Sequence, residues 1–215
     1  MRFTFVNKAR NLGFTMIELL IVIAILGILA VVVLAAINPL EQINRGRDTA
    51  KRADAEQLLS AFERYNAFNG YFPWMNDQND TTVLIDPPIE VDINWVSNTS
   101  ACPILERLST ATAPCVGTQE LKESYVNRVL AYSDPAAANG GPRAQYVYYR
   151  GSTGDNVYVC FSPQSEAFKN EATVRCNQPG GLPTDLAAIS TDICPAAPAD
   201  LNLAGEAGIP MICLP

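Results

Sequence analysis

Gly13-Phe14-Thr15-Met16-Ile17-Glu18 directly precedes nineteen uncharged, mostly apolar residues that run without a break from Leu19 to Ile37. A helix of that length spans about 28 Å, and the hydrocarbon core of a bilayer is about 30 Å thick. The run therefore predicts a membrane-spanning helix. A secretory signal peptide, with its apolar core of only about 7–15 residues, and a plain membrane anchor are the alternatives. Neither alternative explains Glu18, a carboxylate at the edge of the apolar run.

The stretch from Gly13 to Leu20, with the apolar residues that follow to Ala30, resembles the cleavage and methylation signature of type IV prepilins and type II secretion pseudopilins. In that family a prepilin peptidase cuts after the glycine, and the new N-terminal residue is N-methylated. The resemblance implies cleavage between Gly13 and Phe14, methylation of Phe14 and an assembly role for Glu18. It also implies three partners: prepilin peptidase, an inner-membrane assembly platform, and further pilin subunits, either copies of this chain or other pilins.

The charges at Phe14 and Glu18 give this implied role a physical basis. Cleavage after Gly13 would free an ammonium group at Phe14. In an apolar filament core a lone carboxylate or ammonium is destabilising. At about 4 Å and an effective dielectric constant of about 20, the two attract each other by about 4 kcal/mol before desolvation. We expect such a pair to contribute to subunit register more than to net stability.

Composition narrows the class of protein further. The chain has 215 residues, a net charge of −7 and no histidine. Removing residues 1–13 would leave 12 basic and 22 acidic residues, a side-chain balance of −10. An acidic chain is a poor nucleic-acid binder, because such binding needs clustered cations. The absence of histidine removes the commonest general base and metal ligand, so we do not expect an enzyme.

Six cysteines all follow the apolar run, which suggests disulfides in an oxidising compartment. None of them forms a CxxC motif. Six cysteines allow 15 pairings, and our hypothesis is sequential pairing, with free thiols as the alternative. The predicted pairs are Cys102–Cys115, Cys160–Cys176 and Cys194–Cys213.

Residues 40–68 read as an amphipathic helix, with Ala55, Leu58, Leu59, Phe62 and Tyr65 on one apolar stripe and most charges off it. This stretch is either the second half of one long helical spine or a separate core helix after a break at Asn38-Pro39. Asn69-Gly70 is a stop signal. The ending Asn69–Pro73 also resembles the helix end of many pseudopilins.

The remaining residues predict a loop-rich stretch at 74–118, with Asp86-Pro87-Pro88 as a breaker, then a helix over 119–132 and a hairpin of strands 145–150 and 156–161. The sequence after residue 177 is rich in Pro, Ala and Gly. Asp77-Gln78-Asn79-Asp80 offers oxygens to calcium, but its spacing fits no EF-hand loop, which favours a solvated turn. The tyrosines of 146–149 are either an adhesive face or part of the core.

Together these observations predict an α+β fold, with a long N-terminal helix and a small head that has an antiparallel sheet and disulfide-tied loops. The expected parts are a leader at 1–13, a membrane or filament-core helix at 14–37, an amphipathic helix at 38–69 and an extracytoplasmic head at 70–215. The expected function is structural: a subunit of a type IV pilus or a secretion-type pseudopilus, inserted once in the inner membrane before assembly. The alternative is a membrane-anchored extracytoplasmic binding protein that does not polymerise.

Overall fold

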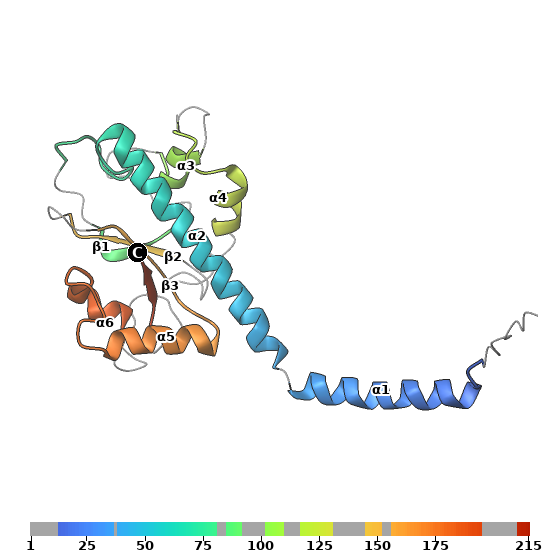
Figure 1. Cartoon of the computed structure of the whole chain (residues 1–215). Helices are drawn as coiled ribbons and strands as arrows, with labels where there is room; N and C mark the ends of the chain where they lie inside the picture. Colours follow the sequence, from blue (N-terminus) through green and yellow to red (C-terminus); the bar gives the residue numbers. More distant parts are fainter. Residues whose placement is uncertain are drawn as a thin grey trace, which may run out of the picture. The chain divides into compact units, whose positions relative to one another are not determined.

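The computed structural model describes residues 13–36, 38–80, 85–91, 102–109, 117–130, 145–151, 156–194 and 210–215. The chain divides into two compact units, Met1–Leu40 and Glu41–Pro215. The first unit contains helix α1, Met16–Ala36. The second contains a four-stranded sheet and the helices that pack on it (Figure 1).

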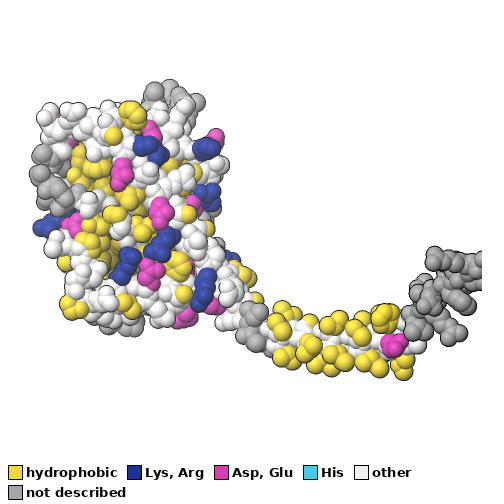
Figure 2. All heavy atoms as spheres, in the orientation of Figure 1, with side chains coloured by type: hydrophobic (Ala, Val, Ile, Leu, Met, Phe, Trp, Pro, Cys, Tyr) yellow, Lys and Arg dark blue, Asp and Glu magenta, His cyan; other side chains and the backbone are white. Residues whose placement is uncertain are grey.

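Helix α1 is apolar along almost its whole length, with Glu18 in its first turn as its one charged residue. The stretch Met16–Leu34 is long enough and apolar enough to cross a membrane, and none of it is buried. Figure 2 shows hydrophobic side chains over the visible face of the helix. The sequence prediction of a long apolar N-terminal helix is confirmed.

Helix α2, Pro39–Asn69, is a separate element from α1, which ends at Ala36. Proline suits the first helical position, because its missing N–H would have no partner there and its φ angle is already helical. At the other end Gly70 has a φ of +77° and its N–H donates to the carbonyl of Asn66. The predicted stop at Asn69-Gly70 is therefore observed, whereas Ile37, which lies between the two helices, is outside the described residues.

The sheet consists of β1 (Ile85–Glu90), β2 (Gln145–Tyr149), β3 (Tyr158–Phe161) and β4 (Ile212–Leu214), in that order and antiparallel throughout. The predicted hairpin is β2–β3, in which Val147 faces Val159. The α+β class with an antiparallel sheet is confirmed.

Both faces of the sheet are covered, so β2 and β3 are buried along their whole length. One face, with Val147, Val159 and Ile212, packs against α2, α3 (Ile104–Ser109) and α4 (Glu123–Leu130). The opposite face packs against η1 (Leu186–Ile189) and α6 (Ser190–Ile193). The buried Ala172 of α5 (Glu166–Asn177; Figure 1) belongs to the core of the first face. Tyr146, Tyr148 and Tyr149 are all buried, which supports the core interpretation over an adhesive face.

Three sequence predictions about this unit need correction. Asp86-Pro87-Pro88, predicted to be a breaker, lies inside edge strand β1, and the pairing register of this strand shifts between Ile85 and Ile89. An edge strand tolerates proline because the missing N–H faces away from the sheet. The predicted helix over 119–132 begins only at Glu123, after Gln119 with its positive φ. The stretch 74–118, predicted to be loop-rich, contains α3 as well as β1.

Candidate functional site

The segment from Gly13 to Glu18 combines a non-helical start with a tightly capped helix. Gly13, Phe14 and Thr15 precede the first helical residue, Met16. The Thr15 backbone N–H donates to Glu18 Oε2 at 2.8 Å, and its hydroxyl donates to the same oxygen at 2.6 Å. The Glu18 N–H in turn donates to Thr15 Oγ1 at 3.3 Å. This reciprocal arrangement is a capping box, in which two otherwise unpaired N–H groups at the helix start are satisfied.

The capping box leaves the Gly13–Phe14 peptide outside the helix. Phe14 is 86% exposed, and a Cβ atom added at Gly13 would meet nothing within 4 Å. A backbone that is non-helical and uncovered can enter a partner's active site without first unwinding a turn. The geometry of this segment is therefore compatible with processing by another protein.

Sequence reasoning identified Glu18 but missed its partner. Thr15-Met16-Ile17-Glu18 has the Ser/Thr-x-x-Glu spacing of a capping box, which was available in the sequence. The structure therefore gives Glu18 a local role, the N-terminal capping of α1, in addition to the role implied by resemblance.

Comparison with known families identifies the same segment. Residues 8–34 match the family described as the prokaryotic N-terminal methylation motif. No curated protein and no solved structure matches the chain. The chain thus carries the prepilin-type signature, and this signature supports a type IV pilin-like or pseudopilin-like precursor. That motif is associated with structural proteins rather than enzymes.

A second cluster of polar groups lies where the first turns of α2 meet the loop before α5. Asp48 is fully buried, and its carboxylate accepts hydrogen bonds from the N–H groups of Gln164 at 3.0 Å and Ser165 at 2.7 Å, and from the Ser165 hydroxyl at 2.7 Å. Lys51 Nζ, also buried, donates to the Ser162 carbonyl at 2.9 Å and lies 3.9 Å from Asp48. These contacts hold the start of α2 to the start of α5.

Two more carboxylates of α2 extend this docking. Glu41 accepts from the Glu166 N–H at 3.1 Å, and this hydrogen bond is the main reason why the pKa of Glu41 is lowered from its ordinary value. Asp54, which is buried, forms an ion pair with Arg128 of α4. The prediction that the charges of α2 fall off its buried stripe is wrong for Asp48, Lys51 and Asp54. They are buried because the head provides each of them with a polar partner.

The disulfides differ from the predicted sequential pairing. Cys160 on β3 pairs with Cys213 on β4, and Cys176 at the end of α5 pairs with Cys194 just after α6. The predicted pairs Cys160–Cys176 and Cys194–Cys213 are therefore wrong. Cysteines that are neighbours in sequence lie on different elements here, and sheet pairing places Cys160 directly opposite Cys213.

The third predicted pair, Cys102–Cys115, is only partly within the described residues. Cys102 is disulfide-bonded, and Cys115 lies outside the described residues. The two described disulfides attach the C-terminal segment to the sheet and to α5, which agrees with the expectation of disulfide-tied loops.

The predicted calcium ligands form a hydrogen-bonded turn. Asp80 accepts from the N–H and side-chain amide of Asn76, and Asp77 accepts from the Asn79 N–H at 2.7 Å. Among the residues that the structure describes, no group of three or more His, Cys, Asp or Glu side chains converges as a metal site would require. These contacts favour the solvated-turn interpretation.

Proposed function

We propose that this chain is a prepilin, processed by prepilin peptidase and assembled into a type IV pilus or a type II secretion-like pseudopilus. In this proposal the peptidase cuts between Gly13 and Phe14, and Phe14 becomes N-methylated. The observation that carries the proposal is the methylation motif matched at residues 8–34. Its support from geometry is the uncovered Gly13–Phe14 peptide immediately before a capped apolar helix.

Helix α1 is the proposed membrane and filament-core element. The first large side chains along it are more than half exposed, Ile17 at 67% and Leu20 at 63%, and such an apolar surface needs a covering other than water. A bilayer before assembly and neighbouring α1 helices after assembly would both provide it. The proposed parts are a leader at 1–13, this helix within 14–37, an amphipathic helix at 38–69 and an extracytoplasmic head at 70–215.

Glu18 has two alternative partners in this scheme. In the free subunit its carboxylate is bound by Thr15. In a filament the Phe14 ammonium of a neighbouring subunit would attract the same carboxylate. Because Thr15 already hydrogen-bonds Glu18, replacing Thr15 by the neighbouring ammonium gains less free energy than the full attraction of two isolated charges. A contact of small net stability can still set the register between subunits.

The edges of the head sheet favour assembly through helices over assembly through strands. On the β4 side, the Met211 N–H donates to the Ile193 carbonyl, and the Arg175 guanidinium donates to the Cys213 carbonyl. On the β1 side, Pro87 and Pro88 have no N–H to offer an added strand. An incoming strand would therefore find few free partners at either edge, whereas α1 offers an uncovered apolar surface.

The direct test is the N-terminal sequence and intact mass of the membrane-bound chain from cells that contain the peptidase. We expect a chain that starts at Phe14 and carries one additional methyl group. Gly13→Val should block processing without affecting the chain itself, because the space around Gly13 is open. Gly27→Ala, also in open space, is the matched control and should be processed normally. An intact Met1 start in the unaltered protein would contradict the proposal.

Electron microscopy of sheared membranes, with cross-linking between tagged subunits, separates the proposal from the alternative of a non-polymerising binding protein. Filaments containing the processed chain support assembly. A chain that is processed but yields neither filaments nor intersubunit cross-links supports the alternative.

A further inference from the structure

The N-terminal turns of α2 carry apolar side chains that the head leaves uncovered. Leu40 is 69% exposed and Ile43 is 51% exposed, one helical turn apart on the same helix. Further along that side of α2, from Asp54 onward, the side chains are buried in the head. The same side of one helix is thus apolar and buried at one end, and apolar and exposed at the other.

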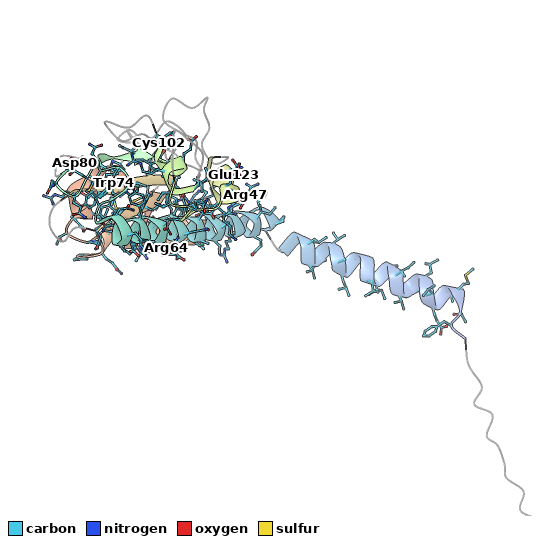
Figure 3. All side chains as sticks on the ribbon, turned by 90° about the horizontal axis from the view of Figure 1, so that it is seen from above. Arg47, Arg64, Trp74, Asp80, Cys102 and Glu123 are labelled. Carbon is cyan, nitrogen blue, oxygen red and sulfur yellow. A yellow bond between two sulfur atoms is a disulfide. The ribbon has the colours of Figure 1, made fainter. Side chains whose placement is uncertain are left out.

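The charges at this end of α2 are mostly paired, with one exception. Glu41 and Arg45 form an ion pair at 3.0 Å, and Asp48 is bound by backbone N–H groups. Arg47, one turn beyond Ile43, is exposed and has no ion-pair partner within the described part of the chain. Figure 3 labels it close to the N-terminal end of α2. A guanidinium beside two apolar side chains is the combination that suits the boundary between phosphate headgroups and acyl chains.

Chain connectivity places this surface next to the bilayer if α1 spans it. From Ala36 to Pro39 the backbone reaches at most about 10 Å, and the helical stretch from Pro39 to Ile43 adds about 6 Å. Ile43 therefore lies within about 16 Å of the end of α1 at any angle between the two helices. Helix α1 itself is about 31 Å long, which fills the hydrocarbon core and leaves its end at the headgroup level.

We propose that the turn formed by Leu40, Ile43 and Arg47 is an interfacial anchor that docks on an anionic phospholipid surface. Leu40 and Ile43 insert at the acyl boundary, and Arg47 binds lipid phosphate. The anchor holds the base of the head against the membrane before assembly and releases it when the subunit leaves the bilayer. The inference rests on the proposed membrane insertion of α1, and it adds a lipid ligand and a specific residue set.

Photo-cross-linking in nanodiscs tests the anchor on the full chain. The photoreactive residue p-benzoylphenylalanine is placed at position 43, with one chain per disc and phosphatidylglycerol-containing lipid. Irradiation should give intact-mass adducts with phospholipid. The same probe at position 57, exposed on α2 about 21 Å further along the helix, is the matched control and should give none. A third probe at position 25 in α1 reports insertion and should also give lipid adducts.

The outcomes separate this inference from the function on which it rests. Lipid adducts at 25 but not at 43 overturn the anchor and leave the prepilin proposal intact. A lack of adducts at 25 overturns membrane insertion, and the anchor with it. With two chains per disc, protein adducts that replace the lipid adducts at 43 would assign the surface to a second copy and overturn the anchor.

Arg47 has its own test within the same experiment. Arg47→Gln should lower the yield of lipid adducts at 43 about fivefold in phosphatidylglycerol discs. The loss should be smaller in discs of phosphatidylcholine alone, whose headgroups carry a phosphate but no net charge. Equal adduct yields from the unaltered chain and the Arg47→Gln variant in anionic discs would overturn the assignment of Arg47 to lipid phosphate.

Discussion

The substitution Asp48→Ala tests whether the start of α2 is held to α5 by a buried carboxylate. Asp48 is 0% exposed and accepts hydrogen bonds from two backbone N–H groups and one hydroxyl. A hydrogen bond to a charged group contributes about 1.5–3 kcal/mol, and the donors left behind stay in a place that water reaches poorly. Removing one partner of a buried charged cluster costs about 3–5 kcal/mol, which we take as the expected loss in free energy of unfolding.

The distances indicate which contact dominates that loss. The N–H and hydroxyl donors lie 2.7–3.0 Å from the carboxylate, whereas Lys51 Nζ lies 3.9 Å away. We therefore expect Lys51→Met, which keeps the volume and leaves Asp48 with its amide partners, to cost less than half as much as Asp48→Ala. The reason is that the ion pair is long and the amide contacts are short.

Urea denaturation of the full chain in micelles measures the effect, with the buried Trp74 as a fluorescent reporter. A loss of about 4 kcal/mol lowers the midpoint by about 2 M if the urea dependence is about 2 kcal/mol per M. Glu56→Ala, on the exposed side of the same helix, is the control and should change stability by less than about 0.5 kcal/mol. A cost for Asp48→Ala below about 1 kcal/mol, or equal costs for Asp48→Ala and Lys51→Met, would refute the reasoning.

Other described contacts lead to three more predictions. Thr15→Val removes the capping box and should lower amide protection in the first turn of α1 about fivefold in micelles, from about 1 kcal/mol of lost capping, whereas Thr15→Ser should keep it. The lowered pKa of Glu41 contributes stability that is complete above the pKa of the unfolded state and is lost as the pH falls through the pKa of the folded state. In an acid titration, the free energy of unfolding should therefore fall less below about pH 4.3 in Glu41→Gln than in the unaltered chain. Replacing the β3–β4 disulfide by two alanines should cost about 4 kcal/mol and replacing the α5–α6 disulfide about 3 kcal/mol, because their sequence separations are 53 and 18; urea unfolding of both variants checks the order.

The sequence predicted the features that depend on local pattern. Nineteen uncharged residues are sufficient to predict α1, and Pro39 and Gly70 are sufficient to bound α2, because helix starts and stops depend on nearby backbone chemistry. The β2–β3 hairpin was predictable for the same reason: two β-rich runs lie close together in the sequence. The capping box of Thr15 and Glu18 is equally local, because its Thr-x-x-Glu spacing stands directly before the apolar run.

The features that were missed depend on contacts between distant residues. Asp48 reads as a surface charge in sequence, since its amide donors at 164 and 165 lie more than 110 residues away. The Cys160–Cys213 pair required knowledge that β4 lies beside β3. Helix α5 was different, because Ser165 directly before it is an N-cap signal that could have been recognised.

The two units of this chain differ in how their apolar surface is covered. In the head, both faces of the sheet are covered and the buried charges have polar partners within the same unit. Hydrogen-bonding groups at the sheet edges are also occupied, so the core of the head needs no further covering. The stretch Met16–Leu34 of α1 is apolar and unburied, and exposed apolar surface on this scale is unfavourable in water. The apolar surface of α1 therefore needs a covering other than water. Under the proposed function, this requirement makes α1, which carries most of the methylation motif, the element of membrane insertion and assembly, and the adjoining turn of α2 adds the uncovered residues Leu40 and Ile43.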